Sequence, residues 1–249
     1  MLWLGQFPVS NQNHLRVVIR LIYGWLILAL HPNQPLSNKF KTLYNEKCIM
    51  TTLLIQTESI PLTVNFPSLL QMTNEQFYEF CQANRELRIE RTANGEVVIM
   101  PPTFSDTGNR NFNIAVELGK WADIEGTGIC FDSSTGFTLP NGATRSPDAS
   151  WIKLECWNVL TEEQKASFAP ICPNFVIELR SASDSLSTLQ DKMQEYIDNG
   201  ASCGWLIDRK NRKVYIYRPS QAPEILDNPE MVSGDPELAG FVLRMTKIW

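Results

Sequence analysis

Histidine is nearly absent from this chain. Only two of its 249 residues are histidines, His14 and His31, and both lie within the first 31 positions. Because no imidazole follows them, the rest of the chain cannot form a Ser-His-Asp triad, a Cys-His pair or a His-ligated zinc site. Any chemistry in that part must use carboxylates, lysine, arginine, hydroxyls or thiols.

Closely spaced cysteines are missing as well. The six cysteines are Cys48, Cys81, Cys130, Cys156, Cys172 and Cys203, and no two of them form a C-x-x-C pair. Zinc ribbons and redox-active dithiols need such pairs, so the spacing disfavours both. It favours buried, reduced cysteines instead, and hence a cytoplasmic protein.

A hydrophobic run long enough to span a bilayer is not found at the N-terminus. The apolar run at 21–30 has ten residues, whereas a spanning helix needs about 20. It has the length of a signal-peptide core, but no small-x-small cleavage site follows.

Residues 1–49 hold five basic residues and one acidic residue, which leaves 50–249 with a net charge of −9. We predict that 1–49 are an extension outside the fold and that Met50 is the true start. A signal or membrane anchor and a structured extension are the alternatives.

Residues 50–249 have the pattern of a single α/β domain. Thr73 and Gln76 form a capping box at the start of a helix, and Asn94-Gly95 between two β-rich runs predicts a hairpin. Predicted helices cover 73–84, 107–124 and 186–198, with a short one after Thr161, and predicted strands cover 129–134, 135–140, 147–152, 174–179, 205–208 and 214–219. This order is typical of a mixed central sheet flanked by helices.

Three charged residues interrupt apolar surroundings. Alternation in strand 174–179 places Glu178 on the same face as Val176, and burying a carboxylate costs several kcal/mol unless it is paired. Asp148 follows Pro147 at the start of a strand, where a carboxylate can project from the end of a sheet. Lys192 lies on the flank of the apolar stripe of its helix, away from the solvated face.

Two carboxylates and a lysine are the minimum set for metal-assisted hydrolysis of a phosphodiester. Mg²⁺ binds one or two carboxylates together with water and phosphate oxygens, and it lowers the pKa of a bound water. The lysine can hold the water or the phosphate. The same residues also fit a structural ion pair among Glu178, Arg180 and Lys192. A paired-carboxylate glycosidase is disfavoured because it leaves Lys192 without a role.

Several motifs, in this order along the chain, resemble the bacterial Uma-two family. They are R-I-E-x-x-x-N-G-E-V-V-I-M-P-P at 88–102, R-S-P-D-A-S-W-I at 145–152, P-N-F-V-I-E-L-R at 173–180, L-Q-D-K-M-Q-E-Y-I-D-N-G at 189–200 and G-W-L-I-D at 204–208. The resemblance covers 50–249. It implies an α/β restriction-endonuclease-like fold of the PD-(D/E)XK superfamily, Mg²⁺-dependent (or Mn²⁺-dependent) endonuclease activity and DNA as partner. No organic cofactor or membrane is implied, and a homodimer is one candidate assembly.

The resemblance also implies roles for individual residues. Asp148 matches the motif aspartate and Glu178 the motif glutamate, which together hold the metal. Lys192 matches a catalytic lysine relocated to the following helix, and Glu90 matches a supporting glutamate. The superfamily's usual lysine position holds Arg180, which stays protonated and cannot act as a base. Arg180 is expected to contact phosphate or support Glu178. This departure leaves open a catalytically silent nucleic-acid or protein-binding module.

One basic turn is a further candidate. Arg209, Lys210, Arg212 and Lys213 cluster between two predicted strands. They can contact DNA phosphates or form an ordinary solvated turn. The acidic balance of the chain argues against a broad, non-specific DNA footprint.

Overall fold

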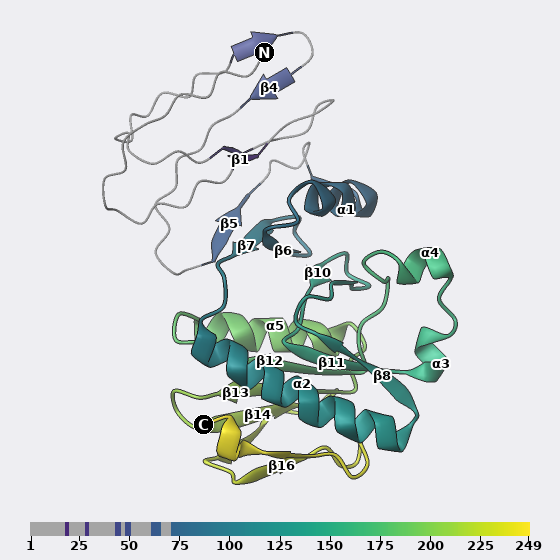
Figure 1. Ribbon diagram of the computed structural model, residues 1–249, viewed down its shortest axis with the longest axis vertical. Coiled ribbons are helices and arrows are strands. Elements are labelled where there is room, and N and C mark those ends of the chain that lie inside the picture. The colour runs from purple at the N-terminus through teal and green to yellow at the C-terminus, as the bar shows by residue number, and fades with distance from the viewer. Residues whose placement is uncertain (1–17, 20–27, 30–42, 46–47, 51–60, 66–70) are drawn as a thin grey trace. The chain divides into compact units, whose positions relative to one another are not determined.

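The computed structural model describes residues 18–19, 28–29, 43–45, 48–50, 61–65 and 71–249 (Figure 1). The chain divides into two compact units, Met1–Ser59 and Ile60–Trp249. In the first unit, β1 (Val18–Ile19) pairs antiparallel with β2 (Leu28–Ala29), and β3 (Leu43–Asn45) pairs antiparallel with β4 (Cys48–Met50). Most of the predicted extension over 1–49, and the segment just after Met50, lie outside the described residues. The second unit contains every candidate site residue.

A six-stranded mixed sheet forms the centre of the second unit. Its strands are β8 (Gly128–Asp132), β11 (Ala149–Lys153), β12 (Phe175–Leu179), β13 (Cys203–Asp208), β14 (Lys213–Tyr217) and β15 (Glu224–Asp227). Their order across the sheet is β15-β14-β13-β12-β11-β8, with β12 and β13 parallel and the other neighbours antiparallel. Parallel neighbours need a crossover, which is supplied by α5 (Leu186–Asp198). The predicted mixed α/β fold is confirmed.

Two helices cover this sheet, α2 (Ser105–Glu125) on one face and α5 on the other (Figure 1). Phe175 and Ile177 of β12 pack with Leu118 of α2, whereas Val176 packs with Met193 of α5. The alternation predicted for this strand is therefore correct. All five residues of β12 are buried, which explains the nearly continuous apolar sequence of the strand. Since side chains two apart share a face, Glu178 is directed to the α5 side, like Val176.

A second sheet of five strands lies in the same unit. In spatial order it contains β5 (Leu62–Val64), β7 (Val97–Met100), β6 (Arg88–Arg91), β10 (Thr144–Arg145) and β9 (Phe137–Thr138). β6 and β7 form the hairpin predicted at Asn94-Gly95, where Gly95 has a φ of 82°. The strand predicted over 135–140 is only two residues long, because the chain turns at 140–142 and returns as β10.

Two of the helices begin at capping boxes. α1 (Asn74–Ala83) begins at the predicted capping box, with Gln76 N donating to Thr73 and Thr73 N donating to Gln76. α2 begins at Ser105, two residues before the predicted start, without a side-chain cap. The remaining elements are α3 (Leu154–Trp157), α4 (Glu162–Lys165), β16 (Met231–Ser233), β17 (Val242–Arg244) and the 3-10 helix η2 (Met245–Lys247). The short helix predicted after Thr161 is α4, which carries a second capping box.

The cysteines whose side chains are described carry free thiols. They are Cys81, Cys130, Cys156, Cys172 and Cys203. Burial raises the pKa of the Cys172 and Cys203 thiols to about 12, so these thiols are protonated and unreactive at neutral pH. Cys172 and Cys203 are buried, as the sequence predicted, whereas Cys81, Cys130 and Cys156 are partly exposed. Within the described part of the chain, no helix combines the length and the apolar character needed to cross a membrane.

Candidate active site

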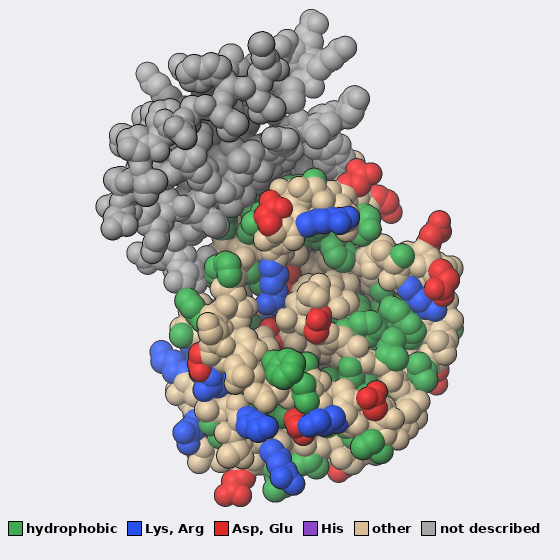
Figure 2. Space-filling view, viewed as in Figure 1, with side chains coloured by type: hydrophobic (Ala, Val, Ile, Leu, Met, Phe, Trp, Pro, Cys, Tyr) green, Lys and Arg blue, Asp and Glu red, His purple; other side chains and the backbone are tan. Residues whose placement is uncertain are grey.

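A cleft of about 730 Å³ brings together residues from β6, β10, β12, α2 and α5. Four residues predicted from the sequence line it: Glu90, Asp148, Glu178 and Lys192. Arg88, Asn111 and Arg145 are among the further polar residues that line the same cleft. On the face drawn in Figure 2, acidic and basic side chains lie interspersed rather than in one broad patch of a single sign.

Asp148 and Glu178 meet through the pairing of β11 with β12. The antiparallel register pairs Ala149 with Ile177, so Asp148 lies opposite Glu178 at the next position, where side chains share a face. Asp148 Oδ2 accepts a hydrogen bond of 2.9 Å from Leu179 N, and Oδ1 accepts one of 2.9 Å from Asn111 Nδ2. Burial raises the pKa of Asp148, and the neighbouring Arg88 only partly opposes this shift.

Glu178 is a buried carboxylate whose pKa is raised. Its side chain is buried, and Oε1 lies 2.8 Å from Lys192 Nζ and accepts a hydrogen bond of 3.1 Å from the Tyr196 hydroxyl. Burial raises the pKa of Glu178 to about 7. Lys192 lowers this pKa, while the negative charge of Asp148 raises it further. A carboxyl group with such a pKa exchanges its proton near neutral pH, or loses it to a bound cation.

Lys192 also pairs with Glu90. Lys192 Nζ donates to Glu90 Oε1 at 2.9 Å, and the other oxygen of Glu90 accepts from Arg145 Nη1 at 3.2 Å. Burial on its own would raise the pKa of Glu90, but Lys192 and Arg145 outweigh it and hold that pKa below its ordinary value. Burial would likewise lower the pKa of Lys192, but Glu178 and Glu90 outweigh it and raise that pKa. Lys192 is therefore an ammonium group that donates hydrogen bonds.

Arg180 lies outside this cluster. The parallel register pairs Leu179 with Ile207, so the next position aligns Arg180 with Asp208. Arg180 Nη1 lies 3.1 Å from both carboxylate oxygens of Asp208, whose side chain is fully buried. The expected contact of Arg180 with Glu178 is wrong, because the register of β12 and β13 gives the guanidinium a different carboxylate.

The basic turn is not part of the cleft. Arg209 forms an ion pair with Asp106, while Lys210 and Arg212 are exposed on the turn between β13 and β14. Lys213 is the first residue of β14. The cleft-lining residues include none of these four side chains.

Several residues of the cluster were missed in the sequence. Arg145 and Asn111 are far from Glu178 along the chain and carry no local signal of their own. Tyr196 lies in the motif at 189–200, but nothing in that motif indicates that its hydroxyl donates to Glu178.

The oxygen donors of the cleft fit a hard divalent cation. Among the described residues, no group of three or more His, Cys, Asp or Glu side chains is arranged to hold a metal ion. Asp148 and Glu178 lie opposite each other at adjacent strands and line the same cleft. Mg²⁺ accepts such a set, since it keeps several of its waters. Asn111 Oδ1, on the same amide that binds Asp148, is buried and has no hydrogen-bond partner in the described part of the chain. A metal-bound water would satisfy that acceptor.

The fold and the cleft together define a restriction-endonuclease-like α/β protein with a paired-carboxylate and lysine cluster at adjacent strand ends. The Uma2 family model, described as "Putative restriction endonuclease", matches residues 74–246, so the chain belongs to this family. A crystal structure titled as that of a "putative nuclease belonging to DUF820" from Anabaena variabilis ATCC 29413 is similar in fold, with 19% identity and a TM-score of 0.58. The match covers 71% of this chain and 97% of that one. No curated protein matches the chain.

Proposed function

We propose that this protein is a metal-dependent endonuclease that hydrolyses phosphodiester bonds of DNA. Asp148 and Glu178 would hold Mg²⁺ or Mn²⁺, Lys192 would act at the attacking water or the phosphate, and Glu90 would hold Lys192 in place. The observation that carries the proposal is the contact of 2.8 Å between Lys192 Nζ and Glu178 Oε1, inside a cleft that Asp148 also lines.

The metal would lower the pKa of a bound water and offset the negative charge that develops on the phosphate. The protein residues have separate tasks. The Lys192 ammonium donates hydrogen bonds to oxygen and is positioned by two carboxylates, so it stabilises negative charge rather than accepting a proton. Leu179 N and Asn111 orient Asp148. We assign Arg180 a supporting role through Asp208 and the end of β13.

Cleavage of DNA by the purified protein tests the proposal. We expect cleavage with Mg²⁺ or Mn²⁺, and binding without turnover with Ca²⁺. Asp148→Asn removes a metal-binding charge while it keeps the shape of the side chain, so it should abolish cleavage and leave the fold intact. A wild-type protein that binds nucleic acid but cleaves none with any of these metals would instead be a binding module.

A further inference from the structure

The cleft has an excess of negative charge that a nucleic-acid substrate must overcome. Seven carboxylate side chains of the described residues line it: Glu90, Glu96, Asp148, Glu178, Asp184, Asp191 and Glu195. Three cationic side chains line it as well: Arg88, Arg145 and Lys192. A phosphate entering this cleft is repelled unless a bound metal and at least one cation with free donors face it.

Two of the three cations are already engaged. Lys192 Nζ contacts both Glu90 and Glu178, at 2.9 and 2.8 Å. Arg145 contacts Glu90 at 3.2 Å and Glu195 at 2.6 Å. Each of these side chains is 12% exposed. Carboxylates balance the charges of Lys192 and Arg145, and these two side chains direct donors toward the same carboxylates.

Arg88 differs from both. Its side chain is 29% exposed, and its ion pair with Asp148 Oδ1 is long at 3.6 Å. Nη2 donates to the Ser146 carbonyl at 3.1 Å, whereas Nε is buried and has no hydrogen-bond partner among the described residues. Nη1 likewise donates no hydrogen bond within the described part of the chain. Arg88 lies two residues before Glu90 on β6, so both side chains project from the same face of that strand.

We propose that Arg88 binds a phosphate oxygen of the substrate next to the metal site, an inference that rests on the proposed function. A guanidinium presents several donors in a planar fork that matches phosphate geometry. A cation bound by Asp148 would take over the neutralisation of that carboxylate and weaken its attraction for Arg88. The guanidinium is then available to the substrate. Arg145 stays paired with its carboxylates, Lys192 acts beside Glu178 at the reacting group, and Arg88 adds a further contact to the phosphate.

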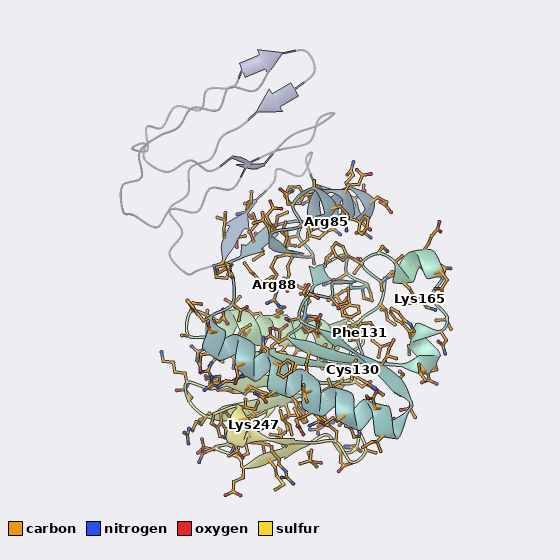
Figure 3. The ribbon with its side chains drawn as sticks, in the orientation of Figure 1. Arg85, Arg88, Cys130, Phe131, Lys165 and Lys247 are labelled. Carbon is orange, nitrogen blue, oxygen red and sulfur yellow. The ribbon has the colours of Figure 1, made fainter. Side chains whose placement is uncertain are left out.

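The test is the binding of a short fluorescent DNA oligonucleotide in Ca²⁺ by Arg88→Gln, compared with Arg85→Gln. Arg85 is exposed, lies beside α1 and does not line the cleft, whereas Arg88 lies on the side of β6 toward the six-stranded sheet (Figure 3). Both variants lose one positive charge within the same short segment. We expect Arg88→Gln to weaken binding on the order of ten- to a hundredfold. It should also lower the salt slope of binding by about one. Arg85→Gln should match the wild type.

Arg88→Lys is a second test variant, which is used if Arg88→Gln does not fold. It keeps a positive charge beside Asp148 but loses the fork, so it should melt like the wild type and still bind the oligonucleotide severalfold more weakly. Equal binding and equal salt slopes for the Arg88 and Arg85 variants of a protein that cleaves DNA would overturn the role of Arg88 and leave the nuclease proposal standing. A wild-type protein that neither binds nor cleaves DNA would overturn both.

Discussion

Two buried ion-pair clusters lie near the same ends of β12 and β13, and they differ in what remains free. Asp208 accepts hydrogen bonds from Arg180, from the backbone N of Lys210 and from the Asn211 side chain, so both of its oxygens are occupied. Glu178 accepts its hydrogen bonds at Oε1, and no described residue donates to Oε2. The first cluster caps a turn, whereas the second lines a cleft and keeps an oxygen available.

This difference shows why an ion pair by itself indicates little about function. Both clusters combine a carboxylate of one element with a cation of another, and both are sheltered from solvent. Breaking either one leaves an unpaired buried charge. Only the Glu178 cluster combines incomplete hydrogen bonding with access and with a second carboxylate, Asp148. These are the properties that a metal-binding site needs.

The largest expected effect comes from exchanging the carboxylates of the two clusters for amides. Glu178→Gln should reduce metal-dependent cleavage to background, because a cation loses one of its two charged ligands. Asp208→Asn should destabilise the fold by about 3 to 5 kcal/mol, since it leaves Arg180 without its counter-charge, but the folded fraction should still cleave. Cleavage assays and urea unfolding of both variants measure the two effects. Full activity in Glu178→Gln would contradict the assignment of the site.

Substitutions of the cations in the two clusters should separate an effect on the cleavage rate from an effect on stability in the same way. Lys192→Met is expected to lower the cleavage rate on the order of a hundred- to a thousandfold, because a preorganised donor to developing charge is lost. Its effect on metal affinity should be smaller. Arg180→Lys should cost about 1 kcal/mol of stability, because an ammonium lacks the second nitrogen with which the guanidinium donates to the Asp184 carbonyl while Nη1 contacts Asp208, and should leave the rate unchanged. A faster Arg180→Lys protein would place that residue at the reacting phosphate instead.

Metal affinity should depend on pH through Glu178. Burial raises the pKa of this carboxyl to about 7, so below that pH a proton must leave before a cation can bind. We expect the affinity for Mg²⁺ to fall by up to about tenfold per pH unit as the pH decreases below about 7. Isothermal titration of wild type and Glu178→Gln over this range checks the expectation. The variant should bind weakly at every pH, and an equally steep pH dependence in it would exclude Glu178 as the titrating group.

The smallest effect is expected from removing the N-terminal residues. A chain that begins at Met50 should fold and melt at the same temperature as the full chain, because the composition and charge of 1–49 differ from those of the remainder. Thermal unfolding followed by circular dichroism compares the two. A lower melting temperature, or an insoluble shorter chain, would show that these residues contribute to the fold.

Much of the fold follows from local chemistry that the sequence displays. The capping boxes at Thr73 and Thr161, the Asn94-Gly95 turn and the alternation in 174–179 each depend on neighbours within a few residues. Elements are less predictable where their length depends on distant partners. β9 is short because the chain turns back to pair as β10, and the start of α2 has no side-chain cap that marks it in the sequence.

The residue types along the chain set the kind of chemistry that is possible, whereas the packing of distant elements selects the partner of each charged side chain. Because no histidine follows position 31, a site in the second unit has to use carboxylates and cations. The alternation of side chains along the strand directs Glu178 toward α5. The register of β12 and β13 decided that Arg180 meets Asp208. The packing of α5 against the sheet decided that Glu178 meets Lys192, and Arg88 stays partly unpaired among the described residues. These contacts join residues up to 102 positions apart, and they depend on how two sheets and two helices pack, which no local pattern encodes.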